Sequence, residues 1–94
     1  MATYAVYHLI HVRTPYQHIP KLVITDVPDD AELTEELLER AGYQFGEFNI
    51  PWANHALDKV DVKKSPADLV ARIRQGEGER IAWPDLVARA EAPL

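Results

Sequence analysis

The sequence contains no cysteine. Disulfides, zinc ribbons, iron–sulfur ligation and thiol catalysis are therefore excluded together. The four glycines form no glycine-rich nucleotide-binding loop, and no stretch approaches the roughly 20 apolar residues that cross a bilayer. No recognised catalytic, cofactor or metal-binding signature is present. Stability must come from side-chain packing, and the sequence predicts no cofactor.

The composition is that of a globular protein. Of 94 residues, 47% are hydrophobic and 27% are charged, which is too apolar for a disordered chain. This length suits one hydrophobic core, so we expect a single domain spanning residues 1–94. No basic segment precedes the apolar stretch near the N-terminus. We therefore expect no signal peptide and a cytoplasmic location.

Charge is unevenly distributed along the chain. The net charge is -5, and residues 1–62 hold ten acids against four bases, whereas residues 63–94 hold five acids against six bases. Nucleic acid binding relies on Lys and Arg to neutralise phosphates. The charge therefore predicts no direct nucleic acid binding and favours a partner protein with a basic surface. The lack of a long apolar run predicts no membrane partner.

The first half of the chain predicts a β-hairpin. Tyr4–Arg13 is rich in β-branched and aromatic residues on both faces, as in a central strand. Residues 14–20 are bracketed by prolines and predict an exposed loop, and Lys21–Val27 predicts the second strand. An open edge of such a small sheet makes a homodimer a further expectation.

A helix is predicted after this hairpin. Asp29 can cap a helix that begins at Ala31, and Gly42 is its natural stop. Leucines at helical spacing give it one apolar face, and glutamates cover the rest.

The second half predicts a third strand and two helices. Tyr43–Ile50 predicts a bent strand, and residues 51–64 fit either a loop or a short strand around Lys59–Val62. Helices are expected from Ser65 to Gln75 and from Pro84 to Ala92. The predicted fold class is α+β, with an antiparallel sheet of about three strands, one packed helix and a C-terminal helical hairpin.

The five letters DLVAR occur twice, at residues 68–72 and 85–89. One interpretation is a helix-turn-helix whose Arg72, Arg74 and Arg89 contact nucleic acid. However, eight residues separate the two helical patterns, whereas that motif uses a turn of three or four. The segment also holds nearly as many acids as bases. We therefore interpret the repeat as a packing pattern used twice.

The histidines and tyrosines suggest an alternative function, that of a small dimeric enzyme. Tyr7, His11 and His18 form a conceivable acid–base site, but no pairing of a nucleophile with a base is visible. The four histidines, of which His8 and His55 are the others, show no ligand spacing typical of a metal site. The sequence therefore identifies no catalytic residue and no metal ligand.

Acidic residues form the sharpest feature of the sequence. Seven acids occur within the fourteen residues from Asp26 to Glu39, and among neighbouring bases only Arg40 is placed to pair with one of them, Glu36, at helical spacing. We therefore predict a non-catalytic adaptor, inhibitor or regulatory protein that binds a basic protein surface. The predicted contact residues are Asp29, Asp30, Glu32, Glu35, Glu36 and Glu39, with Tyr16 and Trp52 as exposed aromatic anchors.

Overall fold

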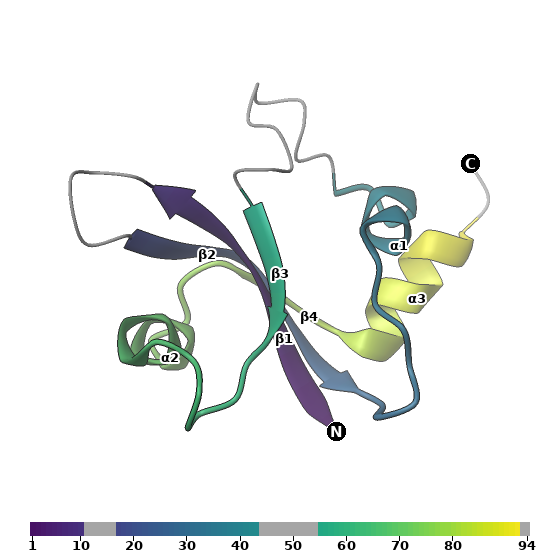
Figure 1. Cartoon of the computed structure of the whole chain (residues 1–94). Coiled ribbons are helices and arrows are strands. Elements are labelled where there is room, and N and C mark those ends of the chain that lie inside the picture. Colours follow the sequence, from purple (N-terminus) through teal and green to yellow (C-terminus); the bar gives the residue numbers. More distant parts are fainter. Residues whose placement is uncertain (11–16, 44–54, 93–94) are drawn as a thin grey trace.

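The computed structural model describes residues 1–10, 17–43 and 55–92, with the side chains of residues 8–10, 17, 18, 55 and 56 excepted (Figure 1). Its centre is a mixed four-stranded sheet in the order β3-β1-β2-β4. β1 pairs antiparallel with β2 and with β3, whereas β2 and β4 are parallel. The strands are β1 (Ala2–Ile10), β2 (Gln17–Val27), β3 (His55–Lys59) and β4 (Glu79–Ala82). The α+β class and the β1–β2 hairpin are confirmed. The sheet has four strands rather than about three, and it is mixed rather than antiparallel because β4 pairs parallel with β2.

Helices cover both faces of this sheet. In Figure 1, α2 lies to the left of the sheet, and α1 and α3 lie together to the right. The helices are α1 (Glu35–Arg40), α2 (Ala67–Arg74) and α3 (Trp83–Glu91). Beneath α1 and α3 lies the larger core, made of Val6, Leu22, Ile24, Val27, Leu38, Ile81 and Leu86. Beneath α2 lies the smaller core, made of Ala5, Val23, Leu69 and Ile73.

The predicted C-terminal helical hairpin is wrong. α2 and α3 make no contact with each other, because the apolar connector around Ile81 forms β4 and pairs with β2. The chain therefore passes along the sheet between the two helices, which cover opposite faces. The two DLVAR copies place Leu69 and Leu86 in different cores, with 3% and 0% exposure. The packing interpretation of the repeat is confirmed, and the helix-turn-helix interpretation is not.

β2 carries two irregularities that keep its apolar side chains inward. Near its end, β1 residues Ala2 and Tyr4 oppose Val27 and Ile24, so β2 has one extra residue there. Asp26 has a φ of 59°, a left-handed conformation that Asp adopts more readily than most residues. This bulge allows both Ile24 and Val27 to enter the larger core.

The second irregularity lies beside Pro20. The sequence predicts residues 17–20 as part of a loop over residues 14–20, and for this part the prediction is wrong. β2 already includes residues 17–20, and Pro20 is a buried strand residue opposite Tyr7. The register shifts beside it, between Val6 and Tyr7. Proline is tolerated in strands at such irregularities, because its missing N–H is not needed there. Residues 11–16 lie outside the described part of the chain.

The first helix is shorter than predicted. α1 begins at Glu35 rather than at Ala31, because Thr34 is its N-cap and accepts a hydrogen bond from the Leu37 N–H at 3.2 Å. Asp29 instead lies in a turn, which the hydrogen bond from the Ala31 N–H to the Pro28 oxygen closes at 3.0 Å. The predicted stop at Gly42 is confirmed by its φ of 97°.

The remaining elements differ in detail from the predictions. The sequence leaves open whether residues 51–64 form a loop or a short strand around Lys59–Val62. The structure has a strand there, β3, but it lies earlier in the chain and ends at Lys59. α2 begins after Pro66, and the Ser65 hydroxyl does not cap it but accepts the Asp61 N–H at 3.0 Å. The predicted strand Tyr43–Ile50 lies, beyond Tyr43, outside the described residues.

Candidate functional site: an acidic surface on and before α1

The predicted acidic residues are all exposed in the structure. We call them the acidic surface: Asp29, Asp30, Glu32, Glu35, Glu36 and Glu39. They lie on α1 and on the segment that leads into it. Leu33, Leu37 and the fully buried Leu38 attach this stretch to the larger core. The carboxylates therefore project from a backbone that is anchored to the core of the domain.

Few cations neutralise this surface. The N-terminal ammonium of Met1 lies 3.7 Å from Asp29 Oδ1, and both groups are exposed. The expected pair of Glu36 with Arg40 is not formed, as is common for exposed helical pairs, which gain little free energy. Within the described part of the chain, Asp30, Glu32, Glu35 and Glu36 form no ion pair. As far as the described residues show, no ion pair thus compensates the charges of these four carboxylates.

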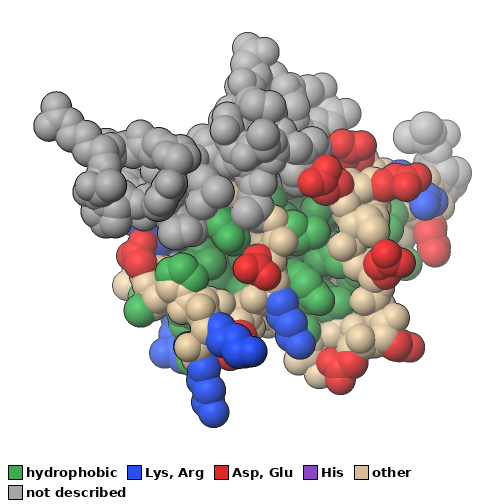
Figure 2. Space-filling view, viewed as in Figure 1, with side chains coloured by type: hydrophobic (Ala, Val, Ile, Leu, Met, Phe, Trp, Pro, Cys, Tyr) green, Lys and Arg blue, Asp and Glu red, His purple; other side chains and the backbone are tan. Residues whose placement is uncertain are grey.

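Charges of opposite sign gather on different sides of the molecule. Figure 2 shows acidic side chains over the side where α1 and α3 lie, and Lys and Arg mostly over the side of α2 and the turn after β3. Exposed Asp85 and Glu91 on α3 extend the acidic side. Exposed Lys63, Lys64 and Arg74 contribute to the basic side. The protein therefore carries a charge asymmetry in space as well as in sequence.

The two aromatic anchors that the sequence predicts, Tyr16 and Trp52, lie outside the described residues. Trp83, the other tryptophan, is half-buried and packs against the larger core. It closes the edge of that core rather than presenting a contact surface.

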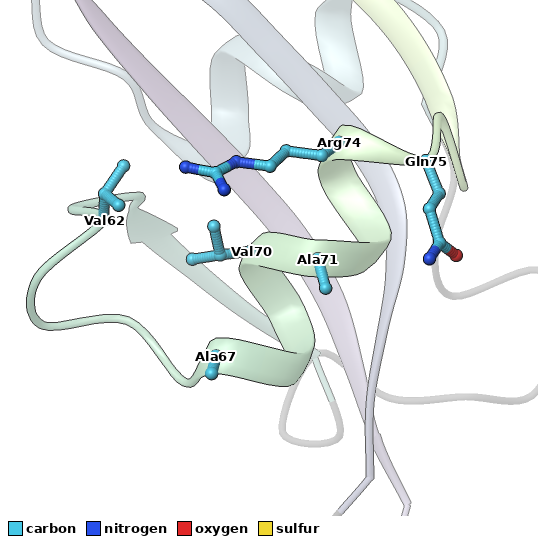
Figure 3. A pocket seen from close by; sticks show the side chains of 6 residues that line it. All are labelled: Val62, Ala67, Val70, Ala71, Arg74 and Gln75. Carbon is cyan, nitrogen blue, oxygen red and sulfur yellow. The ribbon is translucent and has the colours of Figure 1, made fainter.

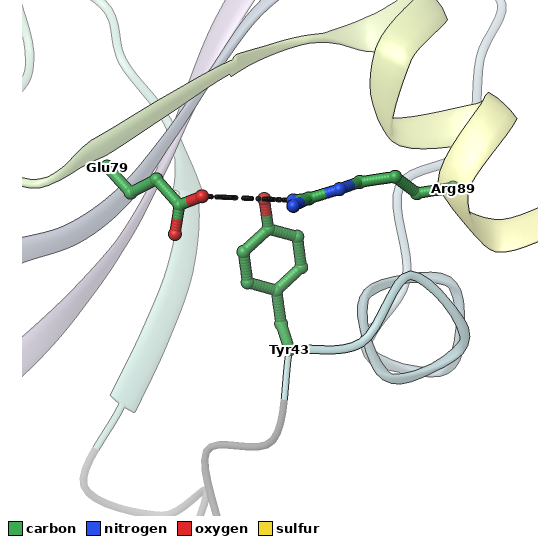
Figure 4. A network of polar contacts seen from close by, with 3 residues as sticks. All are labelled: Tyr43, Glu79 and Arg89. Carbon is green, nitrogen blue, oxygen red and sulfur yellow. Dashed lines mark hydrogen bonds and ion pairs between the residues drawn. The ribbon is translucent and has the colours of Figure 1, made fainter.

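A polar network beside α1 escaped prediction. Arg89 Nη1 donates a hydrogen bond to Tyr43 Oη at 2.6 Å and lies 3.8 Å from Glu79 Oε1 (Figure 4). The Tyr43 hydroxyl in turn donates to Glu79 Oε1 at 3.5 Å. Burial and the nearby Glu79 carboxylate raise the pKa of Tyr43, although Arg89 opposes them. These residues are far apart in sequence, and no local pattern indicates that they meet.

The enzyme alternative gains no support from Tyr7. Burial and then the Asp58 carboxylate raise the pKa of Tyr7 above its ordinary value, which disfavours the deprotonated form that a general base needs. His11 and the side chains of His8, His18 and His55 lie outside the described part, although the register sets His8 opposite His55. Among the described side chains, no three His, Asp or Glu residues are grouped as metal ligands.

A hollow of about 400 Å³ lies on the outer side of α2 (Figure 3). Val62, with 64% of its surface exposed, faces Val70 across it. The Arg74 side chain extends from the end of α2 toward Val62. The hollow is open and shallow, and its lining holds no combination of polar groups typical of a catalytic centre.

No helix in the described ranges has the length and apolarity needed to span a membrane. Comparison of the chain with protein-family models, with curated proteins and with solved structures finds no match. Function is therefore inferred from the surfaces and side chains of this chain alone.

Proposed function

We propose that the protein is a non-catalytic adaptor, inhibitor or other regulatory protein that binds a basic protein surface through its acidic surface. One observation carries this proposal: the carboxylates of Asp30, Glu32, Glu35 and Glu36 are exposed and form no ion pair within the described chain. An unneutralised array of like charges steers an oppositely charged protein toward itself and fixes its orientation.

The way in which the acidic surface is attached supports the same proposal. Leu38 is fully buried and α1 packs against α3. A partner that binds a surface already held in place does not have to order a flexible segment, so less of its binding free energy is lost. The exposed acids of α3 beside it, Asp85 and Glu91, would extend the contact.

The experiment compares two variants with equal charge changes. Asp30→Lys/Glu32→Lys reverses two acids of the acidic surface that precede α1, so no residue of the helix itself is changed. Asp68→Lys/Glu77→Lys reverses two acids on the α2 side, both of which pair with Arg72 in the wild type. The control variant therefore has the larger expected structural cost, and instability cannot explain a selective loss of binding by the test variant.

Immobilised wild-type protein and both variants are used to capture partners from native lysate. We expect the wild type and the control to retain the same basic protein, and the test variant to retain at least about tenfold less of it, the effect of losing roughly 1.4 kcal/mol of binding free energy. Equal capture by all three proteins would contradict the proposal. Circular dichroism of each variant verifies that the fold is kept.

The narrower expectation of inhibition belongs to this proposal and stays a prediction. Homodimerisation also stays a prediction, but for a surface other than the β3 edge, for the reason given in the next subsection. Identification of the captured protein, followed by an assay of its own activity with and without the wild type, distinguishes an inhibitor from an adaptor.

A further inference from the structure

β3 is the end strand of the sheet, and no other described strand lies beyond it. The Val60 N–H donates to the Thr3 oxygen at 2.7 Å, which makes this pair a hydrogen-bonded one. Hydrogen-bonded and non-hydrogen-bonded pairs alternate along antiparallel strands. Ala5 and Asp58 are therefore bonded to each other, and the backbone groups of Leu57 and Lys59 point away from β1, toward the edge.

One of these outward groups is already occupied by a neighbouring side chain. Asp58 Oδ1 accepts the Lys59 N–H at 2.8 Å, and both residues are exposed. A strand approaching this edge needs that N–H for its own ladder. It would have to displace the carboxylate and desolvate its charge, and charged side chains at edge strands are a known obstacle to pairing.

The positions on β3 define how a second copy would pair if this obstacle were absent. On β3, the backbone groups that point outward belong to the odd-numbered residues. If the two-fold axis of the pair of copies passes through Leu57, then Leu57 lies opposite Leu57 of the second copy. This axis also sets residue 58 opposite residue 56 and residue 59 opposite residue 55. This register brings no two like charges opposite each other, whereas an axis at Asp58 would align two carboxylates.

We propose that the Asp58 carboxylate guards the β3 edge and prevents it from pairing antiparallel with β3 of a second copy. The other end of the sheet needs no such guard. β4 has only four residues, and α3 begins directly after it. Short edge strands are poor templates for pairing.

The test is self-association measured by sedimentation velocity over a series of protein concentrations. Asp58→Thr removes the carboxylate and places a residue with high β propensity on the strand. Asp68→Thr removes an exposed acid from α2 and is the matched control. We expect Asp58→Thr to dimerise roughly 25-fold more tightly than the wild type, because a symmetric dimer frees two guarded N–H groups, each worth about a factor of five.

A second variant tests whether the dimer uses this edge. In Asp58→Thr/Lys59→Pro the outward N–H is absent, and no hydrogen bond to β1 is lost, since residue 59 points away from β1. This variant should return to the monomer. The proposal is overturned if Asp58→Thr associates no more strongly than the wild type and Asp68→Thr, or if the proline variant still dimerises as Asp58→Thr does.

Discussion

At the scale of single residues, Tyr43 links the chain just after α1 to β4 and α3 through Glu79 and Arg89. Tyr43→Phe removes the hydroxyl that accepts the hydrogen bond from Arg89, so we expect the free energy of unfolding near pH 8 to fall by about 1 kcal/mol. Urea unfolding measures this loss. No loss near pH 8 would show that the network contributes nothing to stability.

The same variant changes the dependence of stability on pH. The pKa of Tyr43 is raised in the folded protein, so the unfolded chain releases this proton first and unfolding becomes easier as the pH rises above about 10. Below that pH the contribution is fully present. We expect Tyr43→Phe to lose less stability than the wild type in this alkaline range. Part of the decline should remain, because the pKa of Tyr7 is raised as well.

Gly78 is a residue whose missing side chain matters. Its φ is 87°, and an added Cβ would lie 3.0 Å from the Pro20 oxygen. Gly76 has a similar φ of 84° but open space around it, so Gly76→Ala isolates the backbone cost of about 1–2 kcal/mol. We expect Gly78→Ala to cost more, because β2 backbone must also move. Equal losses of unfolding free energy in urea would show that the close approach of Gly78 to Pro20 does not limit the side chain at residue 78.

At the scale of elements, variants of Thr34 and Asp29 test which of the two residues caps α1. Thr34→Ala removes the cap of the Leu37 N–H and should lower the free energy of unfolding by about 1 kcal/mol. Thr34→Ser keeps an accepting hydroxyl and should lose much less. Asp29→Ala should leave α1 intact, because Asp29 lies in the preceding turn. Chemical unfolding of the three variants decides this, and a larger loss for Asp29→Ala would restore Asp29 as the cap.

Local patterns predicted the elements better than their arrangement. The alternation in β1 and β2, the leucines of α1 and the glycines after α1 and α2 identified strands, a helix and its ends. The place of Ile81 could not be found this way, because four residues gain a strand identity only by pairing with β2. That pairing separates α2 from α3 and makes the predicted hairpin impossible. Asp and Thr are both good N-cap residues, so residue type alone does not distinguish Asp29 from Thr34; in the structure Thr34 caps α1 and Asp29 lies in the preceding turn.

Part of the candidate site could be predicted from local sequence patterns, and part could not. The acidic surface was predictable, since exposed glutamates and aspartates need no partner within the fold. The Tyr43 network was not predictable, because it joins residues of separate elements. The Asp58 hydrogen bond is local to β3, but the position of β3 at the edge of the sheet depends on how the strands are arranged. Tyr16 and Trp52 remain predictions, as both lie outside the described residues.

At the scale of the whole molecule, the charges are separated into an acidic side at α1 and α3 and a basic side near α2 (Figure 2). Such an asymmetry orients an approaching charged partner, and its effect weakens as salt screens the field over about 10 Å at 0.1 M ionic strength. Binding through the acidic surface should therefore be strongest at low salt. A contact dominated by apolar burial would depend on salt much less.

The most direct measurement is affinity capture of partners from native lysate by the wild-type protein at low and at moderate salt, with identification by mass spectrometry. The proposed function predicts one basic protein, captured in near-stoichiometric amount at low salt and largely lost as salt rises. Absence of a partner at both salt concentrations, or a partner retained equally at both, would contradict binding through the acidic surface.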